Sequence, residues 1–142
     1  MSASGERQFL DTNILVYAHD KSAGEKHTRA KRLVAGLWET RCGCLSVQVL
    51  QEFYVTVTQK VSRPLAPEEV SRIIFSLSHW HVYTPLAADI LKAIKIQQRY
   101  QLSFWDAMII RSAQALGCGV LLTEDLKPGQ VYEEVKVFNP FF

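Results

Sequence analysis

The sequence lacks the features of a membrane or secreted protein. Hydrophobic residues make up 48% of the 142 residues, yet no uninterrupted apolar run reaches the roughly 18–20 residues that span a bilayer. The polar segment 1–7 also lacks the basic-then-apolar order of a signal peptide. We therefore expect a cytoplasmic protein with no membrane partner.

Cysteine is scarce, which argues against a disulfide scaffold and against a zinc knuckle. The three cysteines are odd in number, and Cys42-Gly43-Cys44 does not have the usual two-residue gap between zinc ligands. We expect reduced, mostly buried thiols. His79 and His81 share one face of a strand end, but no third ligand with suitable spacing is near in sequence.

Two common catalytic motifs are absent as well. The chain contains no G-x-S-x-G nucleophile elbow and no G-x-x-x-x-G-K-[ST] phosphate loop. Net charge is only +2, so total charge alone does not identify a partner.

What is present is an alternation of short apolar strands and helical stretches, without repeats or linkers. This alternation predicts one α/β domain over residues 1–142, with a mostly parallel sheet of four to five strands and a flexible tail at 1–6. The expected strands are 7–11, 44–47, 81–84, 119–123 and, at the sheet edge, 135–138. The expected helices are 13–19, 24–40, 48–60, one beginning near Pro67, 86–101, and one that Ser103 opens and Gly117 closes. The segment 48–60 is rich in strand-favouring residues, but its apolar residues share one helical face, so we assign a helix.

Two strand ends carry similar polar residues. Phe-Leu-Asp-Thr-Asn ends the first strand and Leu-Leu-Thr-Glu-Asp ends the fourth, so Asp11 and Asp125 would meet if the strands are neighbours. Asp11 also fits a helix N-cap, with Thr12 and Asn13 as competitors for that role. Asp125 also fits a turn before Pro128.

Two further acids lie on predicted helices. Asp106 sits in a helix that is apolar nearly all round, where a carboxylate is costly unless something compensates it. The Ser103-x-x-Asp106 spacing also fits a capping box. Glu52 lies opposite the apolar stripe of its helix and is by default a solvated residue.

If these four acids converge, they form an oxygen-only site that suits Mg²⁺ or Mn²⁺. Such ions neutralise charge on a phosphate and lower the pKa of a bound water, which suits phosphodiester hydrolysis. Setting the four acids aside leaves ten against 16 Lys and Arg, so the rest of the chain is basic enough to hold a nucleic acid. The candidate RNA contacts are Arg29, Lys31, Arg32, Lys60, Arg63 and Arg111. Asp89, Glu133 and Glu134 look solvated, and Glu124 is either a ligand or a neighbour of one.

Four segments in order resemble the motifs of PIN-domain ribonucleases, and most closely those of VapC-type toxins of toxin–antitoxin pairs. They are LDTNILVYA, LSVQVLQEF, SFWDAMIIRSA and LLTED, beginning at residues 10, 45, 103 and 121. The resemblance implies a three-layer α/β/α fold, Mg²⁺ or Mn²⁺ as cofactor, RNA cleavage, a homodimer and inhibition by a small antitoxin protein.

The resemblance also assigns roles to residues. Asp11, Glu52 and Asp106 would be the first three metal-binding acids. The fourth falls on Asp125, with the adjacent Glu124 as the alternative. Asn13, which would steady Asp11, and Thr123 would be hydrogen-bonding supports, and the supporting set is completed by Thr12 and Ser46.

Two other functions remain open from the sequence. One is a PIN-like module that binds RNA or a protein without cleaving. The other is an aspartyl-phosphate phosphatase or receiver, which Thr123 and Lys127 favour. A phosphatase, however, would need an Asp where this chain has Asn13.

Overall fold

The computed structural model describes residues 5–142. The predicted tail 1–6 therefore lies largely outside the described residues. Within residues 5–142, no helix is both long enough and apolar enough to cross a bilayer. No disulfide forms in that range, and all three cysteine side chains are buried, as expected.

The core of the fold is a six-stranded sheet in the order β3-β2-β1-β4-β6-β5. Neighbouring strands are parallel except for β5, which runs antiparallel to β6. The strands are β1 Gln8–Leu10, β2 Gly43–Ser46, β3 His81–Tyr83, β4 Val120–Leu122, β5 Val131–Tyr132 and β6 Val135–Phe138. The α/β class and the mostly parallel sheet are therefore confirmed.

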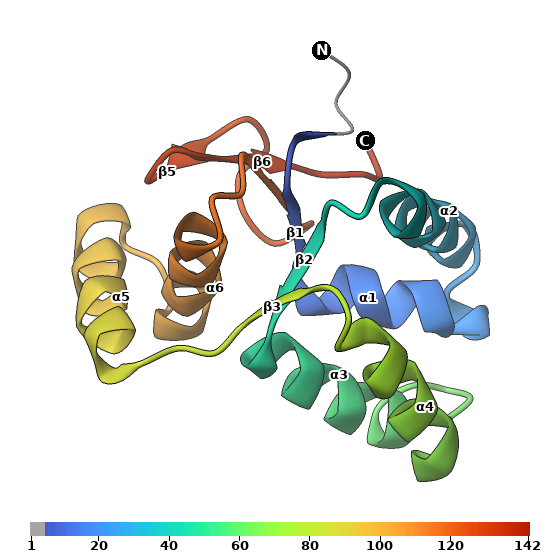
Figure 1. Cartoon of the computed structure of the whole chain (residues 1–142). Coiled ribbons are helices and arrows are strands. Elements are labelled where there is room, and N and C mark those ends of the chain that lie inside the picture. The colour runs from blue at the N-terminus through green and yellow to red at the C-terminus, as the bar shows by residue number, and fades with distance from the viewer. Residues whose placement is uncertain (1–4) are drawn as a thin grey trace.

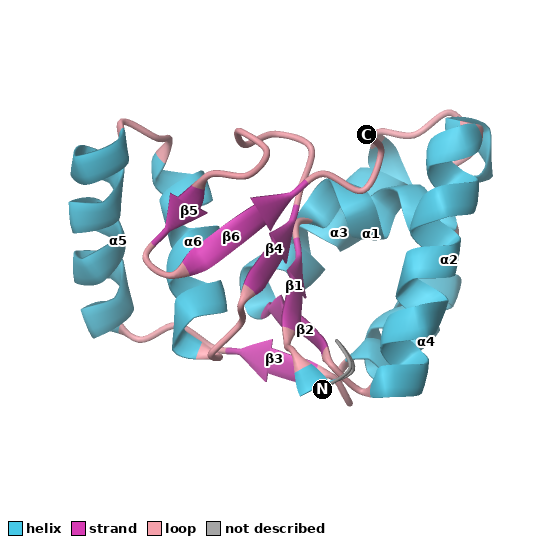
Figure 2. Ribbon diagram, turned by 90° about the horizontal axis from the view of Figure 1, so that it is seen from above, coloured by secondary structure: helices cyan, strands magenta, loops and turns pink. Residues whose placement is uncertain are grey.

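Helices cover both faces of the sheet, which gives three layers (Figure 1; Figure 2). Helices α1 to α4 lie on one side, and α5 and α6 lie on the other. Their bounds are α1 Thr12–His19, α2 Glu25–Thr40, α3 Val47–Gln59, α4 Pro67–Leu77, α5 Ala87–Tyr100 and α6 Phe104–Ala115, with a short 3-10 helix, η2 Lys21–Ala23.

Two features of the sheet differ from the prediction. The strand 135–138 is not at the edge, because β5 pairs beyond it, and β5 also takes the sheet past four to five strands. With only two residues, β5 is too short to show a period in the sequence.

The ambiguous segment 48–60 is helical, as predicted. Ser46, which is fully buried, ends β2 and caps α3 by accepting a hydrogen bond from the Val49 amide. Phe53 and Val57 then bury one face of the helix in the core. Tertiary burial of that face outweighs the strand preference of the segment's β-branched residues.

Asp89 is not solvated, contrary to expectation. Its side chain is 3% exposed and accepts hydrogen bonds from the Tyr83 hydroxyl, the Leu86 amide and the Arg111 guanidinium. Burial alone raises its pKa, but these bonds and the charge of Arg111 outweigh burial and lower the pKa to about 2. Arg111 joins α6 to the start of α5 through this ion pair, at 2.8 Å.

Glu133 is half-buried rather than solvated, and it pairs with Arg99 at 2.9 Å. Glu134 is exposed, as expected.

Candidate active site

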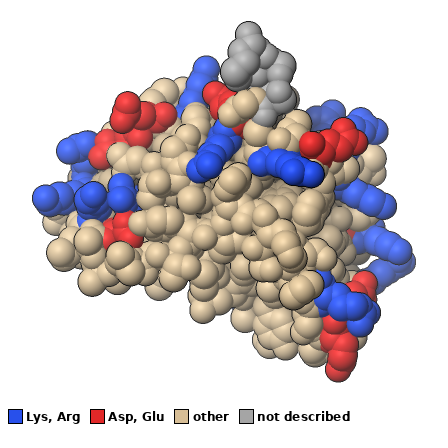
Figure 3. All heavy atoms as spheres, in the orientation of Figure 1, with Lys and Arg blue, Asp and Glu red and all other residues tan. Residues whose placement is uncertain are grey.

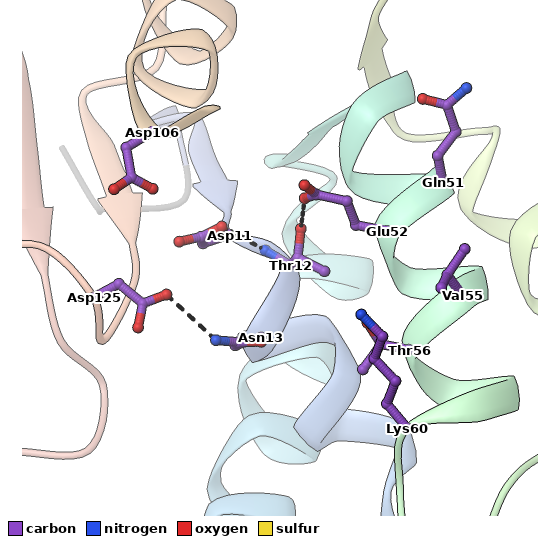
Figure 4. A pocket seen from close by; sticks show the side chains of 10 residues that line it. All are labelled: Asp11, Thr12, Asn13, Gln51, Glu52, Val55, Thr56, Lys60, Asp106 and Asp125. Atoms are coloured by element: carbon purple, nitrogen blue, oxygen red, sulfur yellow. Dashed lines mark hydrogen bonds between the residues drawn. The ribbon is translucent and has the colours of Figure 1, made fainter. Parts of the chain in front are cut away.

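A cavity of about 460 Å³ lies at the carboxyl edge of the sheet, and we call it the acidic cavity. All four predicted acids line it, although they come from four parts of the chain (Figure 4). Its lining residues are Asp11, Thr12, Asn13, Gln51, Glu52, Val55, Thr56, Lys60, Asp106 and Asp125. The parallel pairing of β1 with β4 brings the two polar strand ends together, as the sequence predicted.

Asp11 is the most buried of the four acids, at 8% exposure, and lies between β1 and α1. One carboxylate oxygen, Oδ1, accepts from the Thr12 amide at 2.7 Å, and the other, Oδ2, accepts from the Thr123 hydroxyl at 2.7 Å. Asp11 is itself the N-cap of α1, so neither Thr12 nor Asn13 takes that role. The capping role and a place in the acidic cavity thus belong to the same carboxylate.

Thr123 connects the two acids at the strand ends. Its fully buried hydroxyl donates to Asp11 and accepts from the Asp125 amide at 3.1 Å. The Asp11 amide donates to the Leu122 carbonyl at 3.0 Å, which ties the end of β1 to the end of β4. The hydroxyl therefore sets the position of Asp11 relative to the Asp125 backbone.

Glu52 faces the acidic cavity rather than bulk water. Its Oε1 accepts from the Thr12 hydroxyl at 2.6 Å, across the contact between α1 and α3. Thr56 and Lys60 continue the same side of α3 at intervals of four residues, and both line the cavity. Thr56, Gln51 and Val55 are not among the predicted site residues, although the four-residue spacing from Glu52 is a signal for Thr56.

Asn13 steadies a different acid from the one expected. Its side-chain amide donates to Asp125 Oδ2 at 3.3 Å rather than to Asp11 (Figure 4). Glu124 is bound away from the acidic cavity, because its carboxylate accepts from the Tyr17 hydroxyl and from Lys26, the latter at 2.6 Å. The structure therefore favours Asp125 over Glu124 as the fourth acid of the cavity.

Asp106 enters the acidic cavity from the first turn of α6. Ser103 caps that helix by accepting from the Asp106 amide at 3.1 Å. The Asp106 side chain points into the cavity (Figure 4). The cap uses the backbone amide of Asp106, so the carboxylate itself remains available to face the cavity.

Burial and mutual repulsion raise the pKa of two of these acids. Burial is the main cause for Asp11 and raises its pKa to about 6, and the charges of Asp125 and Asp106 act in the same direction. The hydrogen bonds from Thr123 and Thr12 lower it in part. The pKa of Asp125 is raised by partial burial and then by the charges of Glu124 and Asp106. A bound cation would relieve this repulsion.

The donor set suits Mg²⁺ or Mn²⁺, because every candidate ligand is a hard oxygen. Within residues 5–142, no three acidic, histidine or cysteine side chains lie close enough to form a ready-made ligand shell. Mg²⁺ commonly binds one or two carboxylates directly and keeps several waters, which this open arrangement accommodates.

Of the six predicted RNA contacts, only Lys60 lines the acidic cavity. Arg111 is withdrawn, because it is largely buried in its ion pair with Asp89. Arg29, Lys31, Arg32 and Arg63 are exposed, and they lie elsewhere on the surface.

Comparison with known proteins identifies the family. A model of the PIN domain matches residues 9–134. No curated protein matches the sequence at a significant level. Among solved structures, a toxin–antitoxin complex from Klebsiella pneumoniae is 21% identical with a TM-score of 0.64, and the match covers 90% of this chain and 94% of that one.

Two further structures share the fold. VapC20 of Mycobacterium tuberculosis, described as a sarcin–ricin loop cleaving toxin, is 21% identical over 80% of this chain and 86% of that chain, with a TM-score of 0.63. DNA-bound VapBC of Salmonella typhimurium is 18% identical over 95% and 98%, with a TM-score of 0.65. At these identities the likeness establishes the fold, and the match over residues 9–134 establishes that the chain belongs to the PIN-domain family.

Proposed function

We propose that this protein is a Mg²⁺- or Mn²⁺-dependent endoribonuclease and the toxin of a toxin–antitoxin pair. The observation that carries the proposal is the convergence of Asp11, Glu52, Asp106 and Asp125 in one cavity at the carboxyl edge of a PIN-domain sheet. The likeness to VapC20, described as a sarcin–ricin loop cleaving toxin, supports RNA as the substrate class.

The acids have separate parts in this proposal. Asp11 and Asp106 would hold the ion, and Glu52 and Asp125 would add negative charge around it. When bound, the ion neutralises charge that develops on the phosphate and lowers the pKa of a coordinated water.

The polar neighbours position these carboxylates. Thr123 orients Asp11, Thr12 orients Glu52, and Asn13 orients Asp125, each through a hydrogen bond. Lys60 supplies a positive charge at the rim of the cavity, where it attracts the RNA backbone.

The same comparisons support a protein partner. The likeness to complexes from Klebsiella pneumoniae and Salmonella typhimurium supports a small antitoxin protein as the inhibitor. We also propose a homodimer, on the family resemblance, and the cytoplasm as the place of action, because the RNA substrate is found there.

The test is cleavage of a labelled RNA with Mg²⁺ or Mn²⁺, with and without a chelator. We expect cleavage that the chelator abolishes and that Asp11→Asn or Asp106→Asn lowers by at least about 100-fold, as for loss of a group that stabilises transition-state charge. Glu39→Gln, an exposed acid outside the cavity, is the matched control and should cleave normally. Cleavage that survives chelation, or survives both aspartate substitutions together, would contradict the proposal. RNA binding without cleavage in the presence of metal would favour the non-catalytic alternative.

A further inference from the structure

A second cavity, of about 330 Å³, lies at the other end of α1 from Asp11, and we call it the basic cavity. It is formed by the last residues of α1, the short helix η2, the first turns of α2 and the segment that leads into α4. The ionisable residues that line it are His19, Lys21, His27, Lys31, Arg63 and Glu69.

The cations of the basic cavity are not neutralised by ion pairs. Within residues 5–142, Lys21, Lys31 and Arg63 take part in none of the ion pairs that form. Glu69 is the single acid among the lining residues, so three positive charges face one negative charge even with both histidines neutral. The cavity therefore attracts an anion.

The fold fixes the two histidine rings rather than leaving them loose on the surface. His27 Nδ1 lies 2.8 Å from the Tyr17 carbonyl oxygen. A carbonyl can only accept, so Nδ1 carries the hydrogen and Nε2 is left for another partner. The His19 ring packs edge-on against Phe53, with ring centroids 5.4 Å apart.

The charges around His19 point to the same ligand chemistry. Burial is the main cause that lowers its pKa, and the positive charges of His27 and Lys31 lower it further, while Glu69 acts in the opposite direction. Positive groups are thus close enough to repel one another. An anion between them would relieve the repulsion.

The basic cavity and the acidic cavity lie at opposite ends of α1. Lys60 lines the acidic cavity, and Arg63, three residues further on, lines the basic one. The ends of α1 at Thr12 and His19 are about 11 Å apart, since each helical residue adds about 1.5 Å. A short run of nucleotides spans this distance.

The basic surface also extends outward from the basic cavity. A neighbouring hollow shares His27 and Lys31 with it and adds Arg32 on α2. Lys and Arg side chains gather along this side of the molecule, over α2 and the end of α1 (Figure 3).

We propose that the basic cavity binds a backbone phosphate of the RNA a few nucleotides away from the bond that is cut in the acidic cavity. This inference rests on the proposed ribonuclease function. It assigns a second phosphate site to the substrate strand, so that affinity comes from the basic cavity and chemistry from the acidic one.

RNA binding tests the proposal without cleavage. We would measure the fluorescence anisotropy of a labelled single-stranded RNA in EDTA, with the wild-type protein and with Lys31→Gln/Arg63→Gln. We expect the double variant to bind about tenfold more weakly and to lose about 1 from the salt slope of log K, as for one lost phosphate contact. Lys92→Gln/Lys95→Gln, which removes the same charge from exposed positions on α5, should bind as the wild type does.

NMR locates the binding. Addition of the RNA or of inorganic phosphate should shift the imidazole resonances of His19 and His27, both in the wild type and in Asp11→Asn. Because neither measurement needs metal or turnover, failure of the ribonuclease proposal would show as absent cleavage with these results unchanged.

Three results would overturn the inference. The first is equal weakening of RNA binding by the two lysine-containing double variants. The second is a response of the histidines to inorganic phosphate but not to RNA, which would make the basic cavity a site for a free anion. The third is a response to a poly-glutamate peptide but not to RNA, which would assign the basic cavity to an acidic protein partner.

Discussion

At the scale of single residues, three of the four acids of the acidic cavity, Asp11, Glu52 and Asp125, accept a hydrogen bond from a neighbouring polar side chain. The three neighbours, Thr12, Asn13 and Thr123, come from the same motifs as the acids Asp11 and Asp125, so the sequence could mark them as supports. The sequence could not say which support holds which acid. That depends on side-chain geometry across β1, β4 and α3, and Asn13 accordingly holds Asp125 rather than Asp11.

The positioning role of the Thr123 hydroxyl can be tested by removing it. Thr123→Val keeps the shape but leaves Asp11 Oδ2 and the Asp125 amide without their partner. We expect the free energy of unfolding to fall by about 1–3 kcal/mol, since buried polar groups lose a hydrogen bond, and RNA cleavage to fall by at least about tenfold. Thr123→Ser keeps the hydroxyl and should retain most of the cleavage. Cleavage and thermal unfolding of the three proteins would be compared, and wild-type cleavage by Thr123→Val would contradict the positioning role.

Asp11 makes the metal-free protein pH-sensitive. Its pKa is about 6 in the folded state against 3.8 for the ordinary group, so folding is favoured most below about pH 4 and this advantage is lost as pH rises through 6. Above that pH the ionised carboxylate costs up to about 3 kcal/mol. Asp11→Asn should therefore stabilise the metal-free protein at pH 7.5 and have little effect at pH 4. Urea unfolding in EDTA at the two pH values measures this difference, and equal effects at both would contradict it.

At the scale of helices and strands, the sequence located most elements because their hydrophobic periods and caps agree. Ser103 and Pro67 mark helix starts as predicted. The position of Glu52 could not be derived in this way. Periodicity places it on the polar side of α3, but only the packing of α1 against α3 turns that side toward a cavity. Asp89 also depends on packing that the sequence does not show. It looks like a surface acid in the sequence, but it is buried in an ion pair with Arg111 of α6.

We expect the Asp89–Arg111 ion pair to stabilise the contact between α5 and α6. Asp89→Asn should lower the free energy of unfolding by about 3 kcal/mol, because it leaves a largely buried guanidinium without its counter-charge. Since the pKa of Asp89 is about 2, the contribution of the pair is present above about pH 4 and is lost as pH falls toward 2. Arg99→Gln breaks the more exposed pair with Glu133 and should lower the free energy of unfolding much less, because solvent screens that pair. Equal losses in urea unfolding would contradict this ranking.

At the scale of the whole molecule, charge is divided between the acidic cavity and a basic surface. Four acids collect at one edge of the sheet, while Lys and Arg dominate the side formed by α2 and the end of α1. The composition gives the numbers of acidic and basic residues, and the order of the motifs predicts the acidic cavity. It does not predict the basic cavity, because its cations come from α2, η2 and the segment before α4, which are neighbours only in the folded chain.

Metal binding should be visible in the stability of the whole protein. We expect Mg²⁺ or Mn²⁺ to raise the melting temperature at pH 7.5, because a ligand that binds only the folded state stabilises it, by about 2.7 kcal/mol at 100 times its Kd. Asp11→Asn/Asp106→Asn should remove this response, whereas Glu39→Gln should keep it. Differential scanning calorimetry measures the shifts, and an equal rise in the double variant would place the ion elsewhere.

The hydrogen bond between Thr123 and Asp11 also bears on when the acidic cavity can form during synthesis. It joins positions 112 residues apart, and β1, which carries Asp11, has β4 as one of its two partners. A nascent chain that has not yet emerged as far as Asp125 lacks β4, the Thr123 hydroxyl and the fourth acid. Contacts between such distant positions form late, after local helices. The site that joins Asp11, Thr123 and Asp125 therefore cannot assemble until the chain as far as Asp125 has left the ribosome.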